Sequence, residues 1–544
     1  MSSASRRRDF LAGMLAAGVP LAASRIVPGL AADGVTTELL INVKDPQYGA
    51  AGDGRTDDTA AIQAALDAAA PNPIGGRAGR VYLPPGDYLV GPLVIGQRVT
   101  LEGAGLATRL TFKAGAGPRA VLITNAQNYA GPSDAQGVTI RDLLLDGNKW
   151  ENKGTWQSGI MLNNSTPPGD NSAEWTDGRH QVHHVMIQHF TGDGFIQRDR
   201  GGVQASDIQV WAVDGFGFNI NMDSAYHNCD AGGSGIDGWL IQGNNQLTGC
   251  KAWFSGSALT SSRESEPATA LSVNAPDNPW DGGDVSGLKF TLAGGWGNGF
   301  HYTNISGNTI AGAWSGGTTV GCNAQDNARA GFRIDGARQT LVGCEADSNS
   351  NTGTANGVPV GGRFPGFELV GWAGANTVSG LSWNRSANRV HQAAALGLSA
   401  HAEGNRIELN ADGTLGLDAG DPLMPLMTTD SVMGGNLVQF GAMGGGFVRS
   451  ALGSYTPNPY VAETHALAGA ATINNPSLGG KATAPGIYLI PGMRLRLMVT
   501  QGATGQAVTL GDRFRLNGKA FATTANATTC IEFIYDGVNW QAVS

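Results

Sequence analysis

The sequence predicts an all-β protein: a right-handed parallel β-helix (solenoid) with an N-terminal capping helix and a small C-terminal β-sandwich-like domain. Three observations support this fold class: abundant glycine, a repeated Gly-aromatic strand pattern, and one amphipathic run that follows clustered carboxylates. The chain has 544 residues, of which 82 are Gly and 15% are charged, and no Gly-X-Y period is present. Such a composition favours many turns between short strands and still allows a buried core.

The first residues are typical of an export signal. Arg7 and Arg8 fit the twin-arginine pattern within "RRRDFL", and the apolar run Leu11–Ala23 follows them. We therefore expect residues 1–32 to be a signal peptide and the protein to be periplasmic or secreted. No later run is long and apolar enough to predict a membrane span.

The stretch "GDGRTDDTAAIQAALDAA", residues 52–69, places three carboxylates directly before an alanine-rich run. Asp53, Asp57 and Asp58 could bind a metal or do acid–base chemistry, but they lack the spacing of an EF-hand loop. Thr56, Asp57 or Asp58 can instead cap the first free N–H groups of a helix. The following apolar positions form one helical stripe: Ala61, Ile62, Ala65, Leu66 and Ala69. We predict a helix that covers the open first coil of the solenoid.

A strand pattern recurs along the middle of the chain. "GFNIN", "GFHYT", "GFRID" and "GFELV" begin at Gly217, Gly299, Gly331 and Gly366, and each has an apolar residue at every second position. This period predicts half-buried strands. In the segments "TGCKA", "VGCNA" and "VGCEA" a cysteine takes a place held elsewhere by valine or isoleucine, which predicts buried thiols for Cys250, Cys322 and Cys344. The four Gly-aromatic copies lie 82, 32 and 35 residues apart, and Cys322 and Cys344 lie 22 apart. A turn of roughly 20–25 residues, stretched by loops, is typical of a right-handed parallel β-helix.

The N-terminal stretch continues into "VYLPPGDYLVGPLVIGQRVTLEGAG", residues 81–105. Together these segments resemble the N-terminal signature of the pectate-lyase-like right-handed β-helix superfamily. The match is close over residues 46–105, and the repeats extend it to about residue 410. The resemblance implies a fold that serves lyases, hydrolases, epimerases and phage tailspikes, so it indicates a polysaccharide partner without selecting a reaction.

The C-terminal part follows another pattern. We expect the solenoid over residues 40–410, a connector over 411–460 and a separate β module over 461–544. Arg494 and Arg496 alternate with leucines, which predicts an antiparallel strand with one wet face. The segment "FIYDGVNW" resembles the C-terminal modules of phage tail fibres and tailspikes, and the resemblance implies a homotrimer or glycan attachment. Tyr535 and Trp540 could stack on a sugar or pack in the core of this module.

Polar residues occupy the outward positions of the repeated strands. The row consists of Met161, Asn163, Arg198, Asn219, Asn221, His301, Thr303, Arg333, Asp335 and Glu368. It could line a groove for a polar chain, or it could be an ordinary solvated face. Two segments favour a groove, because long loops over a rigid scaffold often carry function. They are 223–237, with Asp223, Tyr226, His227 and Asp230, and 255–287, with Trp280 and several acids. Trp150, Trp156 and Trp175 in the 147–180 insertion could also supply sugar-stacking surfaces.

Two reactions and one binding role fit these residues. A polysaccharide lyase, the reaction that we favour, needs a cation for the uronate carboxylate and a base for the C5 proton. Arg333 or Arg198 could be the cation, and His227, His301 or Tyr226 the base. An inverting hydrolase needs two carboxyls about 6.5–9.5 Å apart, and Asp223, Asp335 and Glu368 are candidates. The third alternative is a non-catalytic glycan-binding fibre.

The predicted site therefore has two groups of residues. The catalytic candidates are Asp223, Tyr226, His227, His301, Arg333 and Asp335. The substrate-binding candidates are Arg198, Asn219, Asn221, Trp280 and Glu368. No metal ligand set is predicted, although Ca²⁺ could join a lyase site through the acidic loops. The formal charge of −9 argues against nucleic acid as a partner.

Overall fold

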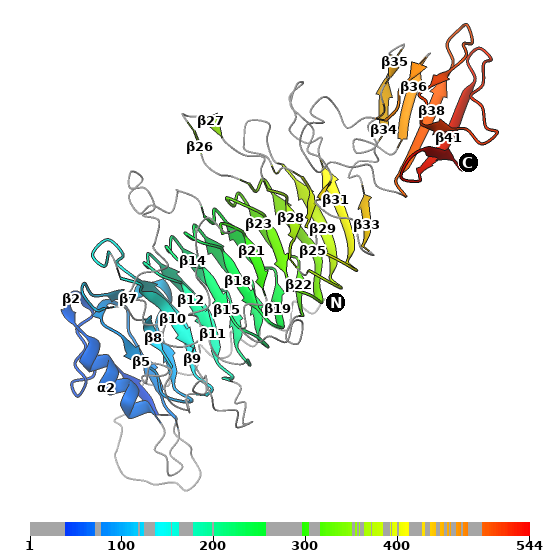
Figure 1. Cartoon of the computed structure of the whole chain (residues 1–544). Coiled ribbons are helices and arrows are strands. Elements are labelled where there is room, and N and C mark those ends of the chain that lie inside the picture. Colours follow the sequence, from blue (N-terminus) through cyan, green and yellow to red (C-terminus); the bar gives the residue numbers. More distant parts are fainter. Residues whose placement is uncertain are drawn as a thin grey trace, which may run out of the picture. The chain divides into compact units, whose positions relative to one another are not determined.

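The computed structural model places the chain from residue 39 onward in strands and one α-helix (Figure 1). It describes residues 39–544 apart from 71–77, 118–119, 125–135, 154, 163–177, 198–200, 257–295, 304–315, 351–353, 356–357, 360–363, 372, 385–391, 393, 400–401, 413–426, 430–435, 442–446, 451–453, 456, 458–463, 469–471 and 477–491. The predicted signal peptide lies outside the described residues. Within them, no helix has the length and apolar character that crossing a membrane requires.

Parallel strands stack into three ladders. In each coil the chain runs through ladder 1, then ladder 2, then ladder 3. Ladder 1 contains β1 (Leu40–Asn42), β3 (Arg80–Tyr82), β6 (Thr100–Glu102), β13 (Gln204–Ser206), β16 (Ala225–His227), β19 (Asn245–Thr248), β22 (Gly317–Val320) and β33 (Leu437–Gly441). Ladder 2 contains β2 (Asp53–Asp57), β4 (Gly86–Val90), β7 (Thr108–Phe112), β14 (Gln209–Trp211), β17 (Asp230–Gly232), β20 (Lys251–Trp253) and β23 (Asn323–Gln325). Long strands run through both ladders: β9 (Thr139–Asp146), β11 (Gln181–Gln188), β25 (Gln339–Asp347), β29 (Thr377–Trp383) and β31 (Arg406–Asp412).

Ladder 3 forms a separate sheet of eleven strands. It contains β5 (Leu93–Val94), β8 (Ala120–Ile123), β10 (Ser158–Leu162), β12 (Phe195–Gln197), β15 (Phe218–Ile220), β18 (Trp239–Gln242), β21 (Phe300–Thr303), β24 (Phe332–Asp335), β28 (Phe367–Leu369), β30 (Leu396–Leu398) and β32 (Met427–Thr429). The predicted parallel β-helix is confirmed. Its ladders continue past residue 410, because β33 pairs with β31 as far as Gly441.

Tight corners join ladder 1 to ladder 2 through the middle of the solenoid. Asp207, Asn228 and Gly249 sit there with φ of 54°, 50° and 63°, a left-handed conformation that suits Asn, Asp and Gly. The long segments 163–180, 254–299 and 304–316 instead connect to one end or the other of a ladder 3 strand.

Aromatic rings fill the interior behind ladder 3. Ring centroids of successive coils lie 3.9 Å apart for Phe218–Trp239, 5.0 Å for Phe300–Phe332 and 4.9 Å for Phe332–Phe367, with nearly parallel planes. These are the aromatic residues of the predicted Gly-aromatic repeat, and each is fully buried. Each ring stacks on the ring of the adjacent coil, and this stacking stabilises the fold in addition to the burial of the rings.

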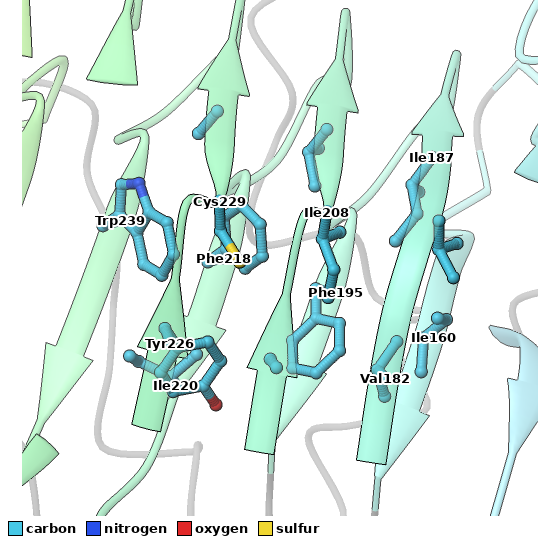
Figure 2. Close-up of a cluster of buried hydrophobic side chains, with 14 of the residues drawn as sticks. Ile160, Val182, Ile187, Phe195, Ile208, Phe218, Ile220, Tyr226, Cys229 and Trp239 are labelled. Atoms are coloured by element: carbon cyan, nitrogen blue, oxygen red, sulfur yellow. The ribbon is translucent and has the colours of Figure 1, made fainter. Parts of the chain in front are cut away.

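The cysteines of the repeat are core residues, as predicted. Cys250, Cys322 and Cys344 are buried free thiols, and Cys229 joins them in the next coil toward the N-terminus. Burial raises the pKa of Cys344 to about 11, so this thiol is a weak nucleophile at neutral pH. Figure 2 shows Cys229 inside the coil with Ile208, Phe218 and Trp239.

The helix α2 (Thr59–Ala69) buries Ile62, Ala65, Leu66 and Ala69 and contacts β1, β3 and β5 at the start of the solenoid (Figure 1). The carboxylates before it are structural. Asp57 Oδ1 accepts the Thr59 N–H, and Asp57 Oδ2 pairs with Lys113 Nζ at 2.6 Å. Asp58 makes no side-chain cap bond to the helix and instead accepts the backbone N–H groups of Ala51 and Gly52 at 2.7 and 3.0 Å. The predicted capping helix is confirmed.

The short elements η1 (Gly105–Ala107), β26 (Thr354–Ala355) and β27 (Val358–Pro359) lie in connections. The C-terminal module has a six-stranded sheet of β34 (Phe447–Ser450), β36 (Thr464–Ala468), β38 (Arg494–Thr500), β41 (Thr528–Tyr535), β42 (Trp540–Ala542) and β40 (Phe514–Arg515). A second sheet has β35 (Ser454–Tyr455), β37 (Thr472–Ile473) and β39 (Thr509–Leu510). Both sheets contribute to one apolar cluster.

The β38 pattern is confirmed, because this strand pairs antiparallel with β41 and buries Leu495 and Leu497. Arg494 and Arg496 lie on its other face and pair with Glu532 at 3.0 and 3.5 Å. Trp540 is fully buried and Tyr535 is 6% exposed. Their rings contact each other at 5.1 Å, so both aromatics pack in the core of the module rather than form a sugar platform.

Candidate functional site

The outer face of ladder 3 carries one continuous row of side chains in register. Met161 pairs with Ile196, which pairs with Asn219 and then Leu240, and Leu240 pairs with His301. The row continues through Arg333 to Glu368. Neighbouring coils lie about 4.8 Å apart, so side chains of adjacent coils contact each other. Of the predicted row, Met161, Asn219, His301, Arg333 and Glu368 share this register, and Thr303 pairs with Asp335 two residues further along the strands.

Apart from Asn219, the N-terminal half of this row is apolar and buried. It belongs to a buried cluster of Ala120, Ile123, Trp156, Met161, Ile196, Phe216, Ile236 and Leu240, with Val94 and Trp296 packed against it. Trp156 is therefore a packing residue. The polar groups that could do chemistry begin only where this cluster ends, at the coil of β21.

A buried Asp–His pair lies at that boundary. His301 Nδ1 lies 2.8 Å from Asp237 Oδ2, and the side chains are 7% and 0% exposed. The second oxygen, Asp237 Oδ1, accepts the backbone N–H groups of Gly297 and Asn298 at 2.7 Å and the Asn298 side-chain amide at 3.1 Å. These donors hold the carboxylate in one orientation. With Nδ1 bound to a carboxylate, Nε2 is the ring atom left to accept a proton.

The chain holds a structural counterpart of this pair two coils earlier. Asp193 Oδ1 accepts the backbone N–H of Phe216 at 2.9 Å, and Asp193 Oδ2 accepts the Asn219 amide at 3.0 Å. Asn219 occupies the position in the row that His301 occupies in β21. The backbone geometry of the two sites thus repeats, while only one of them presents a titratable ring.

Two arginines lie beyond His301. Arg333 Nη1 donates to Glu368 Oε2 at 2.6 Å, and both side chains are more than four-fifths buried. The Arg329 guanidinium sits 4.1 Å from the centre of the Phe364 ring and makes no ion pair within the described part of the chain. Burial lowers the pKa of Arg329, and the charges of Glu368 and Asp237 oppose this shift. Among the described residues, Arg329 is therefore a cation near the pair that has no ion-pair partner.

Aromatic side chains flank this polar group. The Trp296 ring lies 5.1 Å from the His301 ring, tilted by 55°, and Phe364 supports Arg329. We define the candidate site by its charged members and these two rings: Asp237, Trp296, His301, Arg329, Arg333, Phe364 and Glu368. The site combines His301, which the Asp237 carboxylate holds in place, with Arg329, which has no ion-pair partner among the described residues. It also contains the Arg333–Glu368 ion pair.

The remaining predicted residues on ladder 3 lie at its C-terminal edge. Asp335 follows Arg333 by two residues and lies beside Gly371, where an added Cβ would meet its Oδ1 at 2.3 Å. Asn221 and Asp223 follow β15, and the Asn221 carbonyl accepts the Asn245 amide. Asp335 makes no hydrogen bond or ion pair with Asp237 or His301 among the described residues.

The prediction of a polar loop over 223–237 needs correction. The segment is a complete coil containing β16 and β17, because residues 225–227 and 230–232 pair in ladders 1 and 2. Tyr226 points into the core, is fully buried and donates its hydroxyl to Gln197 Oε1 at 2.6 Å (Figure 2). It is therefore not available as a base. His227 is exposed on ladder 1, on another face from His301.

Several predicted residues lie outside the described residues. They are Asn163, Arg198, Trp175 and Trp280, together with all of the 255–287 segment except its first two residues. The acidic loop proposed for Ca²⁺ belongs to this group. In the described part of the chain, no three His, Cys, Asp or Glu side chains are placed to hold a metal.

Sequence reasoning missed Asp237, Arg329, Trp296 and Phe364 as site residues. Asp237 shares the pattern Asp-Gly-aromatic with Asp193 ("DGW" and "DGF"), but this signal is partial, because "DGF" from Asp214 fits it too and does not belong to the site. An acid two residues before the buried aromatic lies at the corner before ladder 3, where it meets the next coil. Nothing local marks Arg329, whose position depends on how the coils stack.

Comparisons with known proteins agree with this architecture. Residues 40–272 match the family described as rhamnogalacturonase A/epimerase, pectate lyase-like. Residues 461–540 match the putative phage tail fibre C-terminal domain. The chain thus carries a pectate-lyase-like parallel β-helix followed by a tail-fibre-like module.

Among curated proteins, the chain resembles two from Azotobacter vinelandii. It is 33% identical to mannuronan C5-epimerase AlgE4 over 202 residues, which is 34% of this chain and 33% of that protein. It is 31% identical to alginate lyase 7 over 212 residues, 37% of this chain and 23% of that protein. The chain thus spans a third or less of the length of these relatives.

Solved structures show likeness at a lower identity. The A-module of mannuronan C-5 epimerase AlgE4 from Azotobacter vinelandii is 18% identical with a TM-score of 0.46, and the alignment covers 74% of this chain and 100% of that one. The enzymatically active domain of bacteriophage CBA120 tailspike protein 2 is 13% identical with a TM-score of 0.49, covering 74% and 52%.

Proposed function

We propose that the protein cleaves an acidic polysaccharide by β-elimination, and that the reaction begins with removal of the C5 proton of a uronate. The observation that carries this proposal is the buried Asp237–His301 pair beside Arg329, which has no ion-pair partner in the described part of the chain. Removing a proton beside a uronate carboxylate requires a base and a cation. His301, whose other ring nitrogen is held by Asp237, can be the base, and Arg329 can be the cation.

In this mechanism Arg329 binds the uronate carboxylate and stabilises the negative charge that develops as the C5–H bond breaks. His301 Nε2 takes the proton, and Asp237 stabilises the imidazolium that forms. The electron pair from C5–H forms the C4=C5 double bond, and the C4–O bond breaks with its electron pair going to the glycosidic oxygen. This oxygen takes a proton from the His301 imidazolium or from water. Arg333 is held by Glu368, so we assign it to orienting the sugar rather than to neutralising the carboxylate.

Epimerisation at C5 is the second candidate. The curated relatives include both a mannuronan C5-epimerase and an alginate lyase. The two reactions can share the first proton transfer and differ in whether the C4–O bond then breaks or C5 is reprotonated from the other face of the ring. The geometry of the pair serves either outcome.

Hydrolysis fits the described groups less well. Asp237 is fully buried and accepts four hydrogen bonds, and Glu368 is ion-paired with Arg333. Both carboxyls are thus engaged by protein donors rather than available to contact a glycosidic oxygen. Asp335 remains a candidate for the tailspike-type hydrolase, and a non-catalytic fibre remains the alternative if no cleavage occurs.

The test uses His301→Asn, which recreates the Asp193–Asn219 pair of the same chain at the candidate site. We expect the variant to keep its melting temperature and to lose at least about 10²-fold in rate, the usual contribution of a general base. Activity is measured on alginate and on acidic exopolysaccharides by absorbance near 235 nm, reducing ends and NMR of C5 configuration. Asn219→Ala is the matched control and should stay active.

Each readout separates the alternatives. New absorbance with new reducing ends supports the lyase, and inverted C5 signals without scission support the epimerase. Reducing ends without absorbance indicate hydrolysis. A fully active His301→Asn protein would contradict the assignment of the base.

A further inference from the structure

A second face of the solenoid carries features of a ligand surface. The outer positions of ladder 2 form two rows in register from β14 to β29. One row contains Trp211, Gly232, Trp253, Gln325, Asp347 and Trp383. The other contains Gln209, Asp230, Lys251, Asn323, Glu345 and Leu381. Neither the proposed reaction nor the aromatic core uses these side chains.

The tryptophans are half-buried and held at their polar edge. Trp253 Nε1 donates to Asp230 Oδ1 at 2.7 Å, and Trp383 Nε1 donates to Glu345 Oε1 at 2.6 Å. The same Glu345 accepts the Asn323 amide at 2.9 Å. The Trp253 and Trp383 rings are thus anchored through their N–H groups, which fixes their orientation before any ligand arrives.

Gly232 makes room for an aromatic platform. The Trp211 and Trp253 rings lie 4.9 Å apart, although their strands are separated by the strand that holds Gly232. A Cβ at Gly232 would lie 2.6 Å from a Trp211 ring atom and 2.8 Å from a Trp253 ring atom. Any side chain at this position would therefore displace the rings.

A protein partner fits this face poorly. In the described part of the chain, the exposed large apolar side chains are Leu39, Leu40, Leu106, Val320, Val342, Val538 and Val543, and none of them belongs to ladder 2. The rings are instead surrounded by amide and carboxylate groups, which suit hydroxyl groups. Flat rings with hydrogen-bonding groups one coil away match the apolar face and the hydroxyl edge of a sugar.

The charge of the face selects among sugars. The two rows hold one cation, Lys251, whose Nζ lies 5.4 Å from the centre of the Trp253 ring. They hold three carboxylates, Asp230, Glu345 and Asp347. Such a face repels a polyuronate and accepts uncharged residues. We propose that the outer face of ladder 2 is a second glycan-binding surface, specific for neutral, hydroxyl-rich sugars and separate from the candidate site on ladder 3.

The experiment uses the full chain carrying His301→Asn, so that no cleavage disturbs binding. Affinity electrophoresis and tryptophan fluorescence are recorded with laminarin and galactomannan as neutral probes and alginate as the charged comparison. We expect at least one neutral probe to bind, with Kd about ten-fold weaker in Trp253→Ala and Trp383→Ala. Trp383→Phe should restore part of the binding because it keeps an aromatic face.

Gln246→Ala, on the exposed face of ladder 1, is the matched control and should bind like its parent. Far-UV circular dichroism and thermal melting show that each variant is folded, independently of any enzymatic activity. The proposal is overturned if neither neutral probe binds, if both tryptophan variants bind like the parent, or if these substitutions abolish binding of alginate only. A change of oligomeric state in the tryptophan variants would show that the face is a contact between copies and would also overturn it.

Discussion

At the residue scale, two equivalent corners of the solenoid differ in one residue. Asn219 faces Asp193 at a structural corner, and His301 faces Asp237 at the candidate catalytic corner. Asp193 and Asp237 both accept a backbone N–H of the next coil, and both hold an outward side chain of ladder 3. The Asn219 side chain can only form hydrogen bonds at its corner. The His301 ring, at the equivalent corner, can also accept a proton. Function at this position therefore depends on which residue the repeat places opposite the aspartate.

Arg329 should govern recognition of the uronate carboxylate. We expect Arg329→Gln to lower kcat/KM roughly 10- to 100-fold on an acidic polymer, because a hydrogen bond to a charged group contributes about 1.5–3 kcal/mol. Arg329→Lys should recover part of the loss. Steady-state kinetics measure both, and Arg338→Gln at an exposed corner is the control. If Arg329→Gln has the same kinetics as wild type, Arg329 does not bind the uronate carboxylate.

The Asp57–Lys113 ion pair should appear in the acid stability of the N-terminal cap. The hydrogen bond from Lys113 lowers the pKa of Asp57 from 3.8 to about 2. A lowered carboxyl pKa gives stability that is present above the ordinary pKa and is lost as pH falls from about 4 to about 2. Lys113→Met should flatten this part of the pH dependence in thermal melts, while Lys519→Met should not. The effect is small, because both groups are partly exposed.

At the element scale, the aromatic stack behind ladder 3 is the main support of the site. Phe332 contacts Phe300 and Phe367, and its neighbour Arg333 projects to the outer face. We expect Phe332→Ala to lower the free energy of unfolding by about 3–5 kcal/mol, as measured by urea denaturation. Thr318→Ala on the exposed face of ladder 1 should change it by less than about 0.5 kcal/mol. A small effect of Phe332→Ala would mean that the coils rearrange to fill the cavity.

At the scale of the whole molecule, a parallel solenoid must protect its open ends. Leu66 is fully buried in the contact between α2 and the first coil. We expect Leu66→Asp to release the cap, lower the melting temperature and promote association through the freed strand edges. Ala68→Asp, on the exposed side of α2, should do neither. Calorimetry and size-exclusion chromatography distinguish the two variants, and identical behaviour would show that the cap is dispensable.

Trimerisation and twin-arginine export stay predictions. The trimer prediction rests on the resemblance of the C-terminal module, whose residues 461–540 match a putative phage tail fibre C-terminal domain. Light scattering of the purified chain would give three times the monomer mass if the prediction is right. Replacement of Arg7 and Arg8 by lysines should retain the protein in the cytoplasm, and unchanged export would exclude the twin-arginine route.

The sequence by itself determined the solenoid, the capping helix and the buried cysteines, because each depends on local periodicity. A residue such as Phe332 faces inward through strand alternation alone, whatever the coil next to it contains. It also placed His301, Arg333 and Glu368 in one outward row, since copies of a repeat stack in register.

Only the tertiary structure decided which of these polar residues meet. The Asp237–His301 pair joins residues 64 positions apart, and no local pattern reports the length of the connection between their coils. The prediction of Tyr226 as a base was wrong for the same reason. The polar segment around it forms the strands β16 and β17, and the Tyr226 ring lies in the core. The physical cause is that periodicity fixes the direction of a side chain, whereas contact between coils depends on how the intervening chain returns to the ladder.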